Sequence, residues 1–193
     1  MKKNQKKLFE TIDLIMIPMF AIVIAISGML SIPSVVPFTM QTMGIFLTLL
    51  VLGGFQGTIS ILIYILLGSF GLPVFSGFSS GIGVLAGPTG GYIVGFLLIG
   101  FVYHIIESRT PDWQKNKQPF RQIAALLLGL FFCYTFGTLW FVKIYTGSIT
   151  TEGIVSAISV CVLPFILPDL LKLWLAFVLS SRIKSLLNIA KKQ

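Results

Sequence analysis

The sequence predicts an all-α integral membrane protein with six transmembrane helices, and three observations lead to this prediction. Hydrophobic residues make up 55% of the 193 residues and charged residues only 10%, whereas a soluble domain carries about a quarter charged residues. No Lys, Arg, Asp or Glu occurs from Leu14 to Ile106, and a span needs about 20 apolar residues. The third observation is that most of the basic residues lie in three short segments of the chain. We therefore expect one multi-pass transmembrane domain, residues 1–193, in the cell membrane.

Glycine, proline and polar segments divide the chain into six apolar stretches. The expected spans cover approximately residues 12–31, 38–53, 57–71, 88–107, 121–144 and 168–187. The first follows a basic N-terminus, as in a signal peptide, but Glu10 and Asp13 interrupt the approach and no A-x-A cleavage site follows. We therefore expect an uncleaved first span. Proline suits the first turn of a helix, so the sixth span is expected to open at Pro168.

The basic residues gather in three segments that a six-span topology places on one face. These residues are Lys2, Lys3, Lys6, Lys7, Arg109, Lys115, Lys117, Arg121, Arg182, Lys184, Lys191 and Lys192. Because cytoplasmic loops carry the excess of Lys and Arg, both termini are predicted to be cytoplasmic. The net charge of +8 then reflects topology and anionic lipid. Nucleic-acid binding is not expected.

An acid and a base remain inside the apolar stretch "FILPDLLKLWLAFVLSS". Asp169 and Lys172 are three residues apart, so on a helix they share one face, about 5–6 Å apart at Cβ. Charged side chains at membrane depth face protein or water and not lipid. Either the pair neutralises itself and locks helix packing, or it lines an outward pocket that binds a polar group of a small molecule.

A second candidate region is the glycine- and aromatic-rich segment from Gly68 to Gly95. Glycine lets backbone approach a ligand closely, and irregular chain at membrane depth must be buried or line a cavity. A flexible linker is the alternative, although few linkers are so aromatic. The candidate binding residues in this segment are Phe75, Ser79, Gly81, Thr89 and Tyr92.

Other patterns are weaker. "GIGVLA" (81–86) matches a dinucleotide fingerprint, but no βαβ unit surrounds it, and no P-loop occurs. Cys133, Cys161 and His104 show no metal-ligand spacing, so neither a metal nor a cofactor is expected. An intramembrane lipid phosphatase or acyltransferase would have only the pair, Glu152 and Lys143 for its chemistry, which is thin for acid–base catalysis.

In the first span, Ala21 and Ala25 stand four residues apart. Small residues at this spacing let another helix approach closely. The spacing also arises by chance in membrane helices, so both a partner interface and a chance pattern remain possible interpretations.

Four stretches in order carry a family resemblance: "VPFTMQT" (36–42), "GSFGLPVF" (68–75), "GPTGGYIVGF" (87–96) and "LPFILPDLLK" (163–172). They resemble the BioY family, the biotin-specific S components of energy-coupling factor (ECF) transporters. The resemblance implies the six-helix S-component fold, biotin as ligand, and uptake driven by a transmembrane T component and two cytoplasmic ATPases. It further implies that Asp169 and Lys172 are polar anchors for biotin, and that Ala21 and Ala25 dock on the T component.

Biotin offers ureido N–H donors, a carbonyl, an apolar sulfur ring and a carboxylate. Asp169 could accept from N–H groups and Lys172 could donate to an oxygen, under a cap formed by segments 31–38 and 70–88. The family usually has Pro-Gly before the aspartate, whereas here Leu167 and Pro168 precede it, so the loop entering the sixth span is expected to differ in shape. An S component for another vitamin, and uptake without ATPases, remain alternatives.

Overall fold

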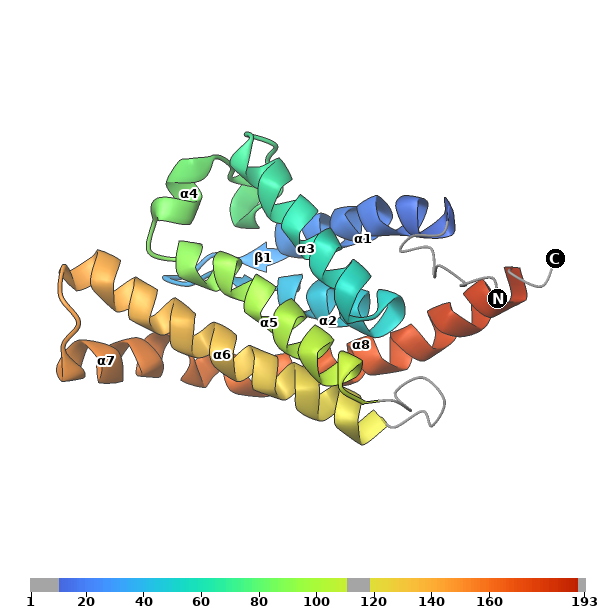
Figure 1. Ribbon diagram of the computed structural model, residues 1–193. Coiled ribbons are helices and arrows are strands. Elements are labelled where there is room, and N and C mark those ends of the chain that lie inside the picture. Colours follow the sequence, from blue (N-terminus) through green and yellow to red (C-terminus); the bar gives the residue numbers. More distant parts are fainter. Residues whose placement is uncertain (1–10, 111–118, 191–193) are drawn as a thin grey trace, which may run out of the picture.

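The computed structural model describes residues 11–110 and 119–190, which form a bundle of helices (Figure 1). Of the predicted cytoplasmic cluster, the lysines at 2–7, 115, 117, 191 and 192 lie outside the described residues. The elements are α1 (Thr11–Met29), β1 (Ser31–Ile32), β2 (Phe38–Thr39), α2 (Gln41–Leu52), α3 (Gly54–Ser69), η1 (Ser76–Phe78), α4 (Ile82–Ala86), α5 (Gly90–Ser108), α6 (Pro119–Thr146), α7 (Thr151–Cys161) and α8 (Leu163–Ala190).

Each of the six expected spans coincides with a helix: α1, α2, α3, α5, α6 or α8. Four of these, α1, α5, α6 and α8, are long and apolar enough to cross a membrane, while α2 and α3 are shorter apolar helices. Such a set of apolar helices makes the chain a multi-pass membrane protein.

Glycines bring the helices together at their crossings. A Cβ at Gly129 on α6 would stand 2.8 Å from the Ile99 Cα on α5, so any larger residue there would push the two backbones apart. On its other side α5 meets α3 through Gly100, where a Cβ would stand 2.6 Å from the Thr58 Oγ1. The core between the helices is apolar and includes Ile24, Phe46, Leu49, Ile61 and Ile99.

The fold contains short elements that the sequence analysis did not predict. β1 and β2 form a two-stranded antiparallel pair within the first expected cap segment. The second cap segment contains η1 and α4, and α4 lies at the left end of the bundle together with α7 (Figure 1). α7 begins after Thr150, whose hydroxyl accepts from the Gly153 N–H and so caps the helix N-terminus. The Thr/Ser/Gly-rich composition of this segment did not predict a helix.

The expected start of the sixth span is wrong. α8 begins at Leu163, and Pro168 lies inside it. Pro164 takes the favourable first-turn position instead. The residues before Asp169 are thus helical and do not form an entry loop. Asp169 lies beyond the first turn, so the helix dipole is not what holds this acid there.

Ala21 and Ala25 are buried within the chain itself. Their exposed fractions are 1% and 6%, and both belong to the core formed with α2 and α3. The small residues therefore allow α1 to pack on its own neighbours. The expectation that these two side chains form a surface for a partner conflicts with this burial.

Candidate functional site

Asp169 and Lys172 form a buried ion pair on α8. The Lys172 Nζ and the Asp169 Oδ1 are 2.6 Å apart, and the side chains are 4% and 2% exposed. The i, i+3 spacing on one helix face produces this contact directly. Since an unpaired charge at this depth would be costly, each side chain depends on the other.

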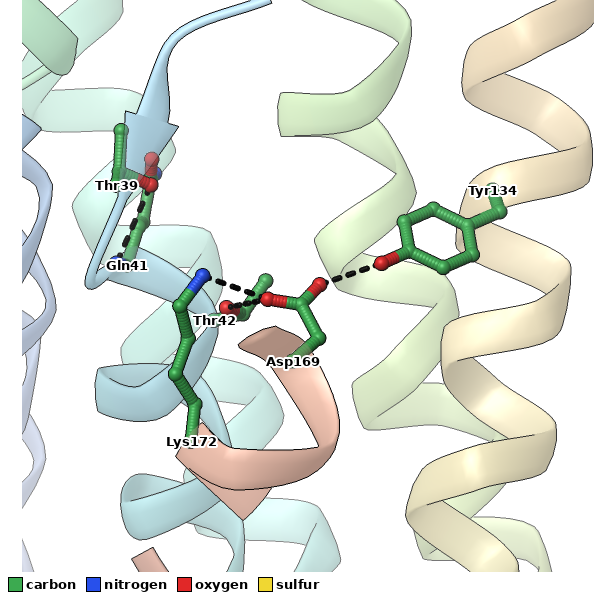
Figure 2. A network of polar contacts seen from close by, with 6 residues as sticks. All are labelled: Thr39, Gln41, Thr42, Tyr134, Asp169 and Lys172. Atoms are coloured by element: carbon green, nitrogen blue, oxygen red, sulfur yellow. Dashed lines mark hydrogen bonds and ion pairs between the residues drawn. The ribbon is translucent and has the colours of Figure 1, made fainter. Parts of the chain in front are cut away.

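Two hydroxyl groups from other helices complete the surroundings of the carboxylate (Figure 2). The Thr42 hydroxyl on α2 donates to Asp169 Oδ1 (2.9 Å), and the Tyr134 hydroxyl on α6 donates to Oδ2 (2.5 Å). Hydrogen bonds to a charged acceptor are stronger than those between neutral groups. The network joins α2, α6 and α8, so the pair locks helix packing. This was the first of the two interpretations of the charged pair.

The Lys172 ammonium faces an aromatic cluster on its other side. It lies 4.5 Å from the centroid of the Phe38 ring on β2, a distance at which a cation is attracted to the ring face. Phe38 in turn stacks on Phe165 of α8, with ring centroids 5.7 Å apart. The strand β2 is thereby fastened to the start of α8.

A cavity of about 140 Å³ lies between the two segments that were expected to form a cap. Four of the predicted binding residues line it: Phe75, Ser79, Thr89 and Tyr92. Gly81 is not among the lining residues; its N–H donates to the Gly68 carbonyl and so fastens the loop. The opposite wall comes from Val36, Pro37, Thr39 and Gln41, which the sequence analysis did not single out as binding residues.

The ion pair lies beside this cavity and not in its lining. Phe38, which contacts Lys172, stands between the lining residues Pro37 and Thr39. Thr42, which contacts Asp169, follows the lining residue Gln41. Figure 2 shows Thr39, Gln41 and Thr42 next to the pair. Segment 37–42 therefore lines the cavity through Pro37, Thr39 and Gln41 and contacts the ion pair through Phe38 and Thr42. Direct contact of the pair with a ligand stays a prediction.

The cavity walls combine apolar surface with fixed polar groups. The buried Phe75 ring meets Tyr64 edge-on at 5.6 Å, and a Cβ at Gly68 would collide with it. The Gln41 amide donates to the Tyr64 hydroxyl (2.6 Å), and the Tyr92 hydroxyl lies 3.1 Å from that of Thr138. Such a mixture suits a small ligand that is partly apolar and partly polar.

The other candidate residues do not join this site. Among the described residues, no group of three or more His, Cys, Asp or Glu could hold a metal ion. Lys143 is exposed and donates to the Gly147 carbonyl, and Glu152 is exposed on α7. Cys133 and Cys161 are buried and free, and His104 packs against Phe55.

Comparisons with known proteins agree with this architecture. The model of the BioY family matches residues 1–189. "Biotin transporter BioY" of Thermotoga maritima is 37% identical, over 90% of this chain and 96% of the relative. "Probable biotin transporter BioY" of Pyrococcus horikoshii is 36% identical, over 77% of this chain and 81% of the relative.

A solved structure matches over almost the whole length. It is the crystal structure of the S-component for biotin from an ECF-type ABC transporter, and it superposes with a TM-score of 0.77 at 27% identity. The match covers 96% of this chain and 95% of the other. By its sequence over residues 1–189 and by its fold, the chain belongs to the BioY family.

Proposed function

We propose that this chain captures biotin at high affinity from outside the cell, as the S component of an ECF transporter. The observation that carries the proposal is a cavity of mixed polarity beside a buried ion pair, in a chain of the BioY family. The BioY family is a family of transporters, so the chain is not an enzyme. No cofactor takes part in binding.

The cavity walls fit the chemistry of biotin. Phe75 and Phe96 offer apolar surface for the sulfur ring, while Ser79, Thr89 and Gln41 offer hydrogen-bonding groups. Lys172 lies over the ring of Phe38, which stands between the lining residues Pro37 and Thr39. In this arrangement biotin lies between segments 31–38 and 70–88 and reaches the pair past the Thr39–Gln41 wall.

Biotin binding requires the cap segments to move so that the cavity enlarges. The cavity of about 140 Å³ is smaller than the roughly 300 Å³ at which pockets for drug-sized ligands begin. Gly77 and Gly81 in the second cap segment have φ values of 67° and 92°, a backbone conformation that glycine adopts without strain. Displacement of this segment would admit the ligand and then close over it.

Energy for uptake would come from partners. The sequence has no nucleotide-binding P-loop, so ATP hydrolysis falls to two ATPase subunits that act through a T component. Six membrane-crossing helices with cytoplasmic termini would place the cavity outside, and movement of the S component in the complex would open it inward. If cells lacking the T component accumulate biotin at the normal rate, the dependence on partners is wrong.

Equilibrium binding of purified full-length chain to a panel of vitamins tests the ligand. Trp140 reports on the cap, because its indole N–H donates to the Gly87 carbonyl (3.0 Å), whereas the exposed Trp174 on α8 serves as an internal reference. We expect biotin alone to change the Trp140 emission, and Trp140→Phe to abolish the change without loss of binding. A folded protein that binds a different vitamin, or none, contradicts the proposal.

A further inference from the structure

Two hydroxyl groups hold the Asp169 carboxylate without lining the cavity themselves. We infer that Tyr134 and Thr42 are positioning residues, which orient Asp169 so that it fixes the Lys172 ammonium beside the cavity wall for the bound ligand. The inference rests on the proposed function, since it assigns the parts of the same site. It goes beyond that function by dividing the roles: Lys172 serves the ligand, and Asp169 with its two hydroxyl donors holds Lys172 in place.

The hydrogen bonds that Asp169 already accepts support these separate roles for Asp169 and Lys172. Oδ1 accepts from both Lys172 and Thr42, and Oδ2 accepts from Tyr134. An ionised carboxylate has about four acceptor positions, so these three donors leave Asp169 little capacity for a ligand.

The Lys172 ammonium, in contrast, keeps hydrogen-bond donors that a ligand can use. An ammonium carries three N–H donors, and one of those on Lys172 points to Asp169 Oδ1 at 2.6 Å. The ammonium also lies over the Phe38 ring, on the strand whose neighbouring residues line the cavity. Lys172 is therefore the member of the pair that can donate to an acceptor oxygen on a ligand.

Both hydroxyl donors are needed to hold the carboxylate in one orientation. Rotation of the carboxylate about its Cβ–Cγ bond would move Oδ1 away from Lys172. Tyr134 on α6 donates to Oδ2 and Thr42 on α2 donates to Oδ1, and the two side chains approach the carboxylate from opposite sides (Figure 2). Loss of either donor frees this rotation, and the ammonium then loses its fixed direction.

The test compares variants that remove one hydroxyl each and keep the shape of the side chain. Tyr134→Phe and Thr42→Val should each weaken biotin binding about tenfold, as expected for a hydrogen bond to a charged group. Thr42→Ser, which keeps the hydroxyl, should restore binding to within about twofold of wild type. Because both residues act through one carboxylate, the double variant should weaken binding by less than the product of the two single effects.

Matched controls separate positioning from packing. Tyr103→Phe and Thr58→Val change a buried tyrosine on α5 and a threonine on α3, both outside the network, and should leave the dissociation constant unchanged. Thermal unfolding is measured for every variant. If Tyr134→Phe and Thr42→Val bind like wild type, if Thr42→Ser is as weak as Thr42→Val, or if the double variant is strictly multiplicative, the inference is wrong.

A ligand-free measurement keeps this inference distinct from the proposed function. The difference infrared spectrum between wild type and Asp169→Asn isolates the carboxylate stretching bands of Asp169. Tyr134→Phe should shift these bands, since it removes the donor to Oδ2, and Tyr103→Phe should not. If wild type binds no biotin, the proposed function fails, while the infrared result still decides whether Tyr134 holds Asp169.

Discussion

At the scale of single residues, the ion pair on α8 is stable only while both members are present. The two side chains are nearly fully buried and contact each other at 2.6 Å. A buried charge that loses its partner keeps its desolvation penalty, which makes removal of one partner cost about 3–5 kcal/mol. The pair therefore carries both a packing role and the proposed binding role.

We expect Lys172→Met to lower the thermal unfolding midpoint of the purified protein strongly, because it leaves the Asp169 charge without its cation. The double variant Asp169→Asn/Lys172→Met should recover much of the loss, since both charges are then gone. Neither variant should bind biotin with wild-type affinity. Lys143→Met, which removes an exposed lysine, is the matched control and should unfold like wild type. A double variant less stable than Lys172→Met would contradict this account.

Sequence reasoning found the pair but not the residues that hold it. Asp169 and Lys172 stand out because charges are rare in apolar helices. Thr42 and Tyr134 are 127 and 35 residues from Asp169, and a hydroxyl on a membrane helix carries no signal by itself. Only the packing of α2 and α6 against α8 shows that these hydroxyls meet the carboxylate.

At the scale of elements, the six apolar helices were predictable, whereas the start of α8, the helix α7 and the β1–β2 pair were not. Apolar stretches and glycine breaks located six helices to within a few residues, because lipid demands continuous apolar chain. The start of α8 was wrong because Pro168 was taken as a helix start, although Pro164 four residues earlier fits the same role. α7 and the β1–β2 pair lie in segments whose mixed composition predicts neither helix nor strand.

The crossing of α5 and α6 depends on glycine, and Gly129→Ala tests it. The added methyl carbon would stand 2.8 Å from the Ile99 Cα, so the two backbones must separate. We expect a loss of about 1–3 kcal/mol in the free energy of unfolding, measured by denaturant titration in detergent micelles. Gly83→Ala on α4 is the control, because nothing lies within 4 Å of the new Cβ. Equal stability of the two variants would show that α5 and α6 can adjust at no cost.

At the scale of the whole molecule, the cavity and the charged ends define a direction across the membrane. The cavity is lined by β2, η1, α4 and the first half of α5. The predicted basic clusters, in contrast, follow α5, lie around the start of α6 and lie near the end of α8. If the positive-inside rule holds for this chain, the cavity opens to the outside. The direction of transport then follows from topology and not from the cavity alone.

Labelling with a membrane-impermeant maleimide on intact cells tests this direction. Ile149→Cys introduces an exposed thiol between α6 and α7, and Arg109→Cys introduces one at the end of α5. We expect the first to react in intact cells and the second only after the cells are opened, because the topology places them on opposite faces. Wild type should stay unlabelled, since Cys133 and Cys161 are each 1% exposed. The reverse pattern of labelling would turn the cavity toward the cytoplasm, and capture of biotin from outside the cell would then be impossible in this conformation.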